Sequence, residues 1–196
     1  MIVSLGLIRV AVPASPTSDA AWLSDPVKRA TVNFAINLVP FAGIAFLWFM
    51  GVLRNRLGEL EDQFFATVFL GSGLLFVVSL YAASAMSGAF LAGLSAESSI
   101  VRTDSTYNFA RDVVNATLNV FGMKMAGAFI FSTCVIGLRT GIFARWVAVT
   151  GFACGLILLL VIGTWKWIQL LFPFWMLLLS TYILITDLRW SKKRVR

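Results

Sequence analysis

The sequence contains no histidine, and this absence removes several kinds of chemistry at once. Histidine is a common ligand of zinc and haem iron, and it is the base of Ser-His and Cys-His catalytic pairs. The chain has only two cysteines, Cys134 and Cys154, and both lie inside apolar runs. A disulfide framework is therefore excluded, and we interpret the two thiols as small packed hydrophobes. We expect neither a metal site nor a bound cofactor.

Charged residues are also scarce. They make up 13% of the 196 residues, about half the share found in a soluble domain. Apolar residues make up 59%, and the mean hydropathy is +0.87. A soluble protein of this length cannot bury so much apolar surface, because its outside must remain in contact with water. The composition therefore predicts an integral membrane protein whose solvent is lipid.

Five apolar runs are long enough to cross a bilayer, which requires about 20 residues per helix. We expect these spans at residues 31–53, 64–94, 109–138, 143–163 and 168–186. The connections between them are too short to hold a soluble domain. The predicted fold is all-α: a polytopic transmembrane helical bundle of about five helices over residues 31–187, followed by a basic tail at 188–196.

Residues 1–30 precede the first run and combine a short apolar stretch with a linker that contains proline and serine. The apolar stretch, residues 1–12, has about half the length of a span. It lacks a basic flank in front and an evident cleavage site, so it does not fit a signal peptide. It is either a segment that lies on the membrane surface or the end of an additional transmembrane helix. The sequence leaves both alternatives open.

Basic residues alternate between the connections, and this alternation predicts an orientation. Arg54 follows the first run, Arg139 and Arg145 bracket the turn between the third and fourth runs, and the tail is strongly basic. The positive-inside rule then places the C-terminus in the cytoplasm, with the tail against anionic lipids. The net charge of +7 therefore indicates lipid contact rather than nucleic acid. Lys28 and Arg29 lie on the wrong side for this rule.

Polar side chains inside the runs are the most informative residues, because each costs free energy in lipid unless it finds a partner. In the predicted topology, three runs carry such side chains in the outer half of the membrane. The cluster consists of Asn33, Asn37, Tyr81, Ser84, Ser87, Arg111, Asp112, Asn115, Asn119 and Lys124. It either lines an outward-opening pocket that binds a ligand, or it consists of interhelical hydrogen-bonding groups. We favour the second interpretation.

Lys124 lies about midway along the third run, where a lysine costs about 2.5–3.5 kcal/mol to insert. No carboxylate in another run shares its depth, so an ion pair within one chain is not expected. The side chain either snorkels toward the outer surface or holds the anionic headgroup of a lipid or substrate. We favour snorkelling.

Small residues at four-residue spacing predict close contacts between helices. They include Gly88 in the second run, and Gly151 and Gly155 in the fourth. This spacing does not distinguish packing within one chain from dimerisation.

Motifs for catalysis are missing: the sequence has no Walker loop, no dinucleotide fingerprint and no HExxH. We therefore expect a protein that is not an enzyme and that serves as a packing or accessory subunit or as a self-associating bundle. The alternative is a binder or carrier of a small amphiphile, lipid or anion through the outer polar cluster. The expected partners are the lipid bilayer, further copies of the chain, or a larger membrane complex, and no nucleic acid.

Two stretches, PFAGIAFLWF at residues 40–49 and FFATVFLGSGLLF at residues 64–76, resemble small bacterial multi-pass membrane proteins of unassigned function. The resemblance covers a small part of the chain and rests on apolar residues. It implies the bacterial inner membrane as the location and no particular activity.

Overall fold

The structure is a computed structural model, and it describes residues 26–57, 63–95, 104–160 and 168–194. Apart from the turn after Arg139, the described residues are helical, and they contain no strand. The predicted all-α fold class is confirmed. The apolar stretch at residues 1–12 lies outside the described residues.

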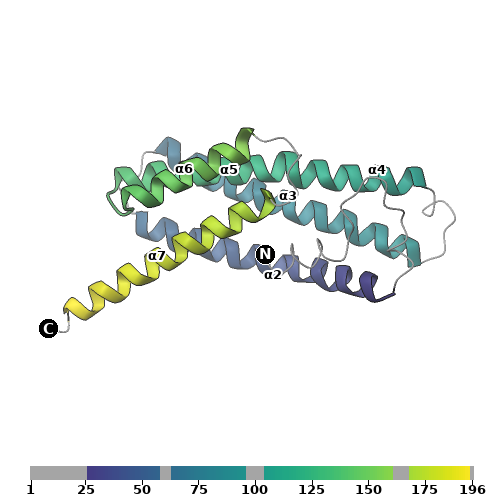
Figure 1. Ribbon diagram of the computed structural model, residues 1–196, viewed down its shortest axis with the longest axis horizontal. Helices are drawn as coiled ribbons and strands as arrows, with labels where there is room; N and C mark the ends of the chain where they lie inside the picture. The colour runs from purple at the N-terminus through teal and green to yellow at the C-terminus, as the bar shows by residue number, and fades with distance from the viewer. Residues whose placement is uncertain (1–25, 58–62, 96–103, 161–167, 195–196) are drawn as a thin grey trace.

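The helices follow one another along the chain with short connections (Figure 1). They are α2 (Pro26–Leu57), α3 (Gln63–Ser95), α4 (Asp104–Asn115), the π-helical segment η2 (Ala116–Gly122), α5 (Met123–Arg139), α6 (Arg145–Leu160), the 3-10 turn η3 (Ile168–Leu170) and α7 (Leu171–Arg194). Helix α4, segment η2 and helix α5 are continuous and together form the third expected span.

Four helical segments are long and apolar enough to cross a membrane: Pro26–Asn55, Phe64–Gly93, Asn108–Arg139 and Ile168–Thr186. They coincide with the first, second, third and fifth predicted runs. The fourth run corresponds to α6, which has 16 residues. Such a helix is about 24 Å long, shorter than the hydrocarbon core of about 30 Å. Residues 161–163 lie outside the described part of the chain, so a fifth crossing stays a prediction.

Two helix boundaries differ from the limits of the apolar runs. Helix α2 begins at Pro26 rather than at residue 31, and it therefore includes Lys28 and Arg29. Proline suits the first position of a helix, because its missing N–H has no partner there. Helix α7 continues to Arg194, so most of the expected tail is helical. An apolar run ends at the first charged residue, whereas a helix can continue through charged residues that lie outside lipid.

The third span lies at the centre of the bundle. In its most apolar stretch of 18 residues, 61% of the residues are buried, against 28–33% in the corresponding stretches of the other spans. Its Phe129, on α5, packs among four phenylalanines of other helices: Phe46 of α2, Phe69 and Phe76 of α3, and Phe172 of α7. Ring centroids lie 4.8 Å apart in the Phe69–Phe129 pair, 5.2 Å in Phe46–Phe129 and 4.7 Å in Phe76–Phe172. These contacts are within the range of favourable aromatic pairs, so four helices share one filled aromatic core.

Helices α5 and α6 approach each other closely. A Cβ atom on Gly127 would lie 3.0 Å from the carbonyl oxygen of Gly155. The turn between these helices follows Arg139 and contains Gly141, whose φ of 69° is the left-handed conformation that glycine adopts after a helix. The hydroxyl of Tyr182 on α7 accepts a hydrogen bond of 3.1 Å from the backbone N–H of Ala144. The turn is thereby tied to α7.

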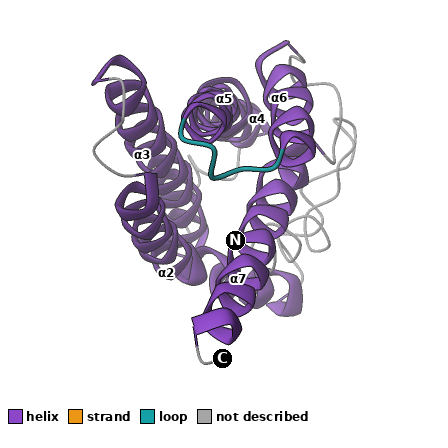
Figure 2. Cartoon of the chain, turned by 90° about the vertical axis from the view of Figure 1, so that its left-hand side faces the viewer, coloured by secondary structure: helices purple, strands orange, loops and turns teal. Residues whose placement is uncertain are grey.

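The helices differ in how far they extend along the bundle. Figure 1 shows α2, α3 and the α4–α5 span running side by side over the full length, whereas α6 and α7 accompany only one half, and α7 diverges from the rest. In the end view of Figure 2, α5 lies between the α2–α3 pair and the α6–α7 pair. We call the end with Arg54, Arg139 and Arg145 the basic end. The opposite end is the projecting end.

Candidate functional site

The level at which lipid ends can be estimated by counting from the basic end. A hydrocarbon core of about 30 Å corresponds to about 20 helical residues. Counting back from Arg54 leads to Phe34, and counting from Phe64 and Arg139 leads to Ser84 and Asn119. Gly122 packs against Ser79, and Gly88 faces Ile36, so the second and third counts end at nearly one level and Phe34 lies further out. We call the level of Ser84 and Asn119 the boundary. The segments beyond it, residues 26–33, 85–95 and 104–118, are called the projection (Figure 1).

The structure divides the predicted polar cluster between two places. Asn33 and Asn37 are exposed on α2, and the Asn37 side-chain amide donates hydrogen bonds to the backbone oxygen (2.8 Å) and side-chain oxygen (3.3 Å) of Asn33. Asn115 and Asn119 lie on α4 and η2 instead. In the described part of the chain, no hydrogen bond joins the amides of α2 to those of α4 and η2. The described hydrogen bonds thus place these amides in two separate groups.

A chain of amides connects the start of α7 to the third span. The Gln169 side chain, 5% exposed, donates through Nε2 to Oδ1 of Asn119. Asn119 in turn donates to Oδ1 of Asn115 over 3.4 Å. Asn119 belongs to η2, and π-helical insertions are frequent at functional positions. Of the two contacts, the Gln169–Asn119 bond joins separate helices, whereas the Asn119–Asn115 bond lies within one continuous span.

Gln169 was missed by sequence reasoning, because a single glutamine at the edge of an apolar run resembles an interfacial residue. The only signal is its place directly after Trp165, Lys166 and Trp167, where an aromatic belt predicts the level of the headgroups.

The hydroxyl groups of the predicted cluster all have partners. Ser84 and Ser87 donate to backbone oxygens one turn earlier in α3, at 2.9 Å and 2.8 Å. Tyr81 reaches another helix and donates to the backbone oxygen of Pro40 at 3.0 Å. The serines are satisfied locally, and the tyrosine ties α3 to α2.

Arg111 and Asp112 form a weak pair on the projection. The nearest nitrogen and oxygen atoms are 3.5 Å apart, and the two side chains are 29% and 70% exposed. The Nε atom of Arg111 is buried without a hydrogen-bond partner among the described residues. Neighbouring residues on a helix point in different directions, so Asp112 cannot also reach this atom well.

Lys124 is half-buried on α5, five residues from Asn119 toward the basic end. This separation places its Cα about 7.5 Å inside the boundary. The structure gives it no ion pair with a described residue. A long side chain at this depth can carry its ammonium to the boundary, and the geometry supports snorkelling.

The three predicted packing glycines have different surroundings. A Cβ atom on Gly151 would lie 2.7 Å from Nε1 of Trp175, and one on Gly155 would lie 3.2 Å from the backbone oxygen of Gly127. The first position has no space for a Cβ atom, and the second is tight. A Cβ atom on Gly88 would meet only Ile36, at an ordinary 3.9 Å.

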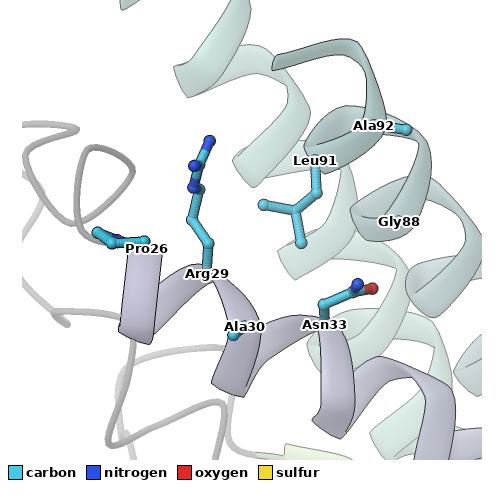
Figure 3. A pocket seen from close by; sticks show the side chains of 7 residues that line it. All are labelled: Pro26, Arg29, Ala30, Asn33, Gly88, Leu91 and Ala92. Atoms are coloured by element: carbon cyan, nitrogen blue, oxygen red, sulfur yellow. The ribbon is translucent and has the colours of Figure 1, made fainter. Parts of the chain in front are cut away.

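A cavity of about 320 Å³ lies between α2 and α3 in the projection (Figure 3). It is lined by Pro26, Arg29, Ala30, Asn33, Gly88, Leu91 and Ala92. Of the site and packing residues predicted from the sequence, the cavity therefore brings together Asn33 and Gly88. Arg29 was not predicted as a site residue, although its position on the wrong side for the positive-inside rule pointed to it.

The described residues contain no group of three or more cysteine, aspartate or glutamate side chains that could hold a metal ion. Comparisons with protein families, curated proteins and solved structures find no match to this chain. The helices are those of an α-helical membrane protein, and the interpretation of function rests on the geometry of the projection.

Proposed function

We propose that this protein is a non-enzymatic membrane subunit that associates with a second copy of itself through α4. It would reside in the bacterial inner membrane, with the basic end in the cytoplasm and the projection outside. The observation that carries the proposal is the large aromatic side chain of Phe109, which is 72% exposed on the projection.

The position of Phe109 is unfavourable for an isolated chain. It lies ten residues beyond Asn119, about 15 Å outside the hydrocarbon core, whereas each headgroup layer is about 5–7 Å thick. Water therefore surrounds an apolar ring, and burial against a partner recovers about 1.5–3 kcal/mol. The exposed side chains near it, Asn108 and Asp112, are polar. An aromatic centre with a polar rim is typical of an interface.

Charge favours a second copy as the partner. In a two-fold dimer, every contact occurs twice: if one residue of the first copy contacts a second residue of the partner, then that second residue of the first copy contacts the first residue of the partner. Arg111 and Asp112 carry opposite charges on adjacent residues, and each is poorly paired within the chain. Two copies of α4 related by a two-fold axis can therefore exchange these charges while the two Phe109 rings meet.

A carrier has less support, because it needs a route through the bundle, and the aromatic core fills the centre of the described spans. Binding of a ligand at one end of the bundle, without transport, is compatible with a subunit that associates with a second copy.

The test is the mass of the protein released from lipid nanodiscs in a native mass spectrometer. We expect a dimer for the parent and at least tenfold weaker association for Phe109→Ala, because two rings lose their contact. Phe174→Ala is the matched control, since Phe174 is 62% exposed on α7, on the lipid side of the boundary. The double variant Arg111→Asp with Asp112→Arg should dimerise better than either single variant. A monomeric parent, or a dimer insensitive to Phe109→Ala, would contradict the proposal.

A further inference from the structure

We propose that the cavity between α2 and α3 binds a phosphate group, from an anionic lipid headgroup or from free phosphate, through Arg29 and Asn33. The two residues are four positions apart on α2 and therefore lie on one face of the helix. Figure 3 shows both side chains rising from α2 beside α3, with Leu91 facing Arg29. The cavity thus combines a cation, an amide and an apolar wall.

The electrostatics of this corner favour an anion. Arg29 has no ion-pair partner among the described residues, and the first turn of α2 contains no acidic residue. The N-terminus of a helix carries a partial positive charge, and Arg29 adds a cation to it. A bound anion at this position is therefore favourable. A guanidinium matches the geometry of phosphate oxygens through paired hydrogen bonds.

The depth of the cavity is compatible with two sources of the phosphate, a lipid headgroup and free phosphate. Arg29 lies beside Leu91 and Ala92, which are seven and eight residues beyond Ser84 and therefore about 10–12 Å outside the hydrocarbon core. A headgroup layer is about 5–7 Å thick on each side of the bilayer, so the cavity lies at its outer surface, and the experiment below distinguishes the two sources. Leu91 and Ala92 supply an apolar wall beside the phosphate.

The volume supports a headgroup rather than a whole lipid. About 320 Å³ is at the lower end of the range of ligand pockets, which begins near ~300 Å³. The acyl chains would remain in the bilayer beside α2 and α3.

The experiment places the full chain in nanodiscs that contain phosphatidylglycerol and phosphatidylcholine and counts retained lipids by native mass spectrometry. We expect the parent to retain a phosphatidylglycerol molecule and Arg29→Gln to bind it roughly tenfold or more weakly. Lys28→Gln is the matched control, since it removes the same charge at the same depth from a residue that does not line the cavity. Ala92→Leu fills the cavity without changing charge and should also lower retention.

A second arm titrates inorganic phosphate. Phosphate that fails to displace the retained phosphatidylglycerol identifies the lipid as the ligand. Displacement at millimolar concentration, lost in Arg29→Gln, supports the phosphate site but identifies free phosphate as its source. Equal losses in Lys28→Gln and Arg29→Gln with no effect of Ala92→Leu would indicate diffuse surface attraction and would overturn the proposal. Retention that does not depend on Arg29 in either arm would overturn it as well.

Discussion

At the scale of single residues, the contact between α6 and α7 at Gly151 leaves no space for a side chain. Trp175 of α7 is 1% exposed, and its ring lies directly against this glycine. The same indole nitrogen has no hydrogen-bond partner in the described part of the chain. Close packing thus takes precedence over hydrogen bonding at this position.

We predict that Gly151→Ala lowers the free energy of unfolding by about 1–3 kcal/mol, because the added methyl group forces Trp175 to move. Thermal melts in detergent measure the effect. Gly71→Ala is the control: nothing lies within 4 Å of its Cβ position, and alanine is the better helix former by about 1 kcal/mol. Equal melting of Gly151→Ala and the parent would show that the contact is looser than described.

The same residues show what a pattern can and cannot predict. Gly88 and Gly151 belong to the same kind of small-residue spacing, yet a Cβ atom fits at the first and clashes at the second. Spacing predicts which face of a helix a residue occupies, but the distance to the opposite backbone depends on larger neighbours such as Trp175. Arg29 and Gln169 were overlooked for a similar reason, since their roles depend on other elements of the chain.

At the scale of elements, the start of α7 is docked on η2 through one pair of amides. Gln169 is buried, and its bond to Asn119 joins the hairpin of α6 and α7 to the central span. In lipid, an amide without a partner is costly, so such a bond fixes the level at which a helix begins.

We predict that Asn119→Leu and Gln169→Leu each destabilise the bundle by about 1–3 kcal/mol, because each leaves one amide without its partner. The double variant should lose less than the sum of the two, with a coupling of about 0.6–1.7 kcal/mol. Unfolding of the four proteins in mixed micelles completes the cycle. Strict additivity would mean that the two amides do not interact.

The spans themselves were predictable from the sequence, because lipid requires about 20 apolar residues per crossing. The structure therefore agrees on the existence of the helices at residues 31–53, 64–94 and 168–186. The division of the third run into α4, η2 and α5 was not predictable. A π-helical segment differs from an α-helix in the number of residues per turn and not in hydropathy. Asn119 and its neighbours therefore have the hydropathy pattern of an ordinary α-helix in the sequence.

At the scale of the whole molecule, the distribution of charge predicts the orientation. Arg54, Arg139 and Arg145 lie together at the basic end, as the positive-inside rule requires of cytoplasmic segments. Arg29 lies at the projecting end, where the proposed phosphate site gives it an anionic partner.

We predict that the C-terminus is cytoplasmic and that the connection at residues 96–103 is external. Fusions after Arg196 and within this connection, made with an enzyme active only outside and a protein fluorescent only inside, measure both positions. Fluorescence should come from the first fusion and enzyme activity from the second. External activity from the fusion after Arg196 would reverse the assignment.

The divergence of α7 makes the two ends of the bundle unequal in width. Near its start, Phe172 and Trp175 are buried against the bundle, whereas Leu184 and Ile185 further along are exposed. Figure 1 shows the helix moving away from its neighbours in the same direction. The bundle is therefore wider at the basic end. In a bilayer, a wedge of this kind fits best where the leaflet that holds its broad side is convex, so we expect the chain to prefer curved membranes over flat ones.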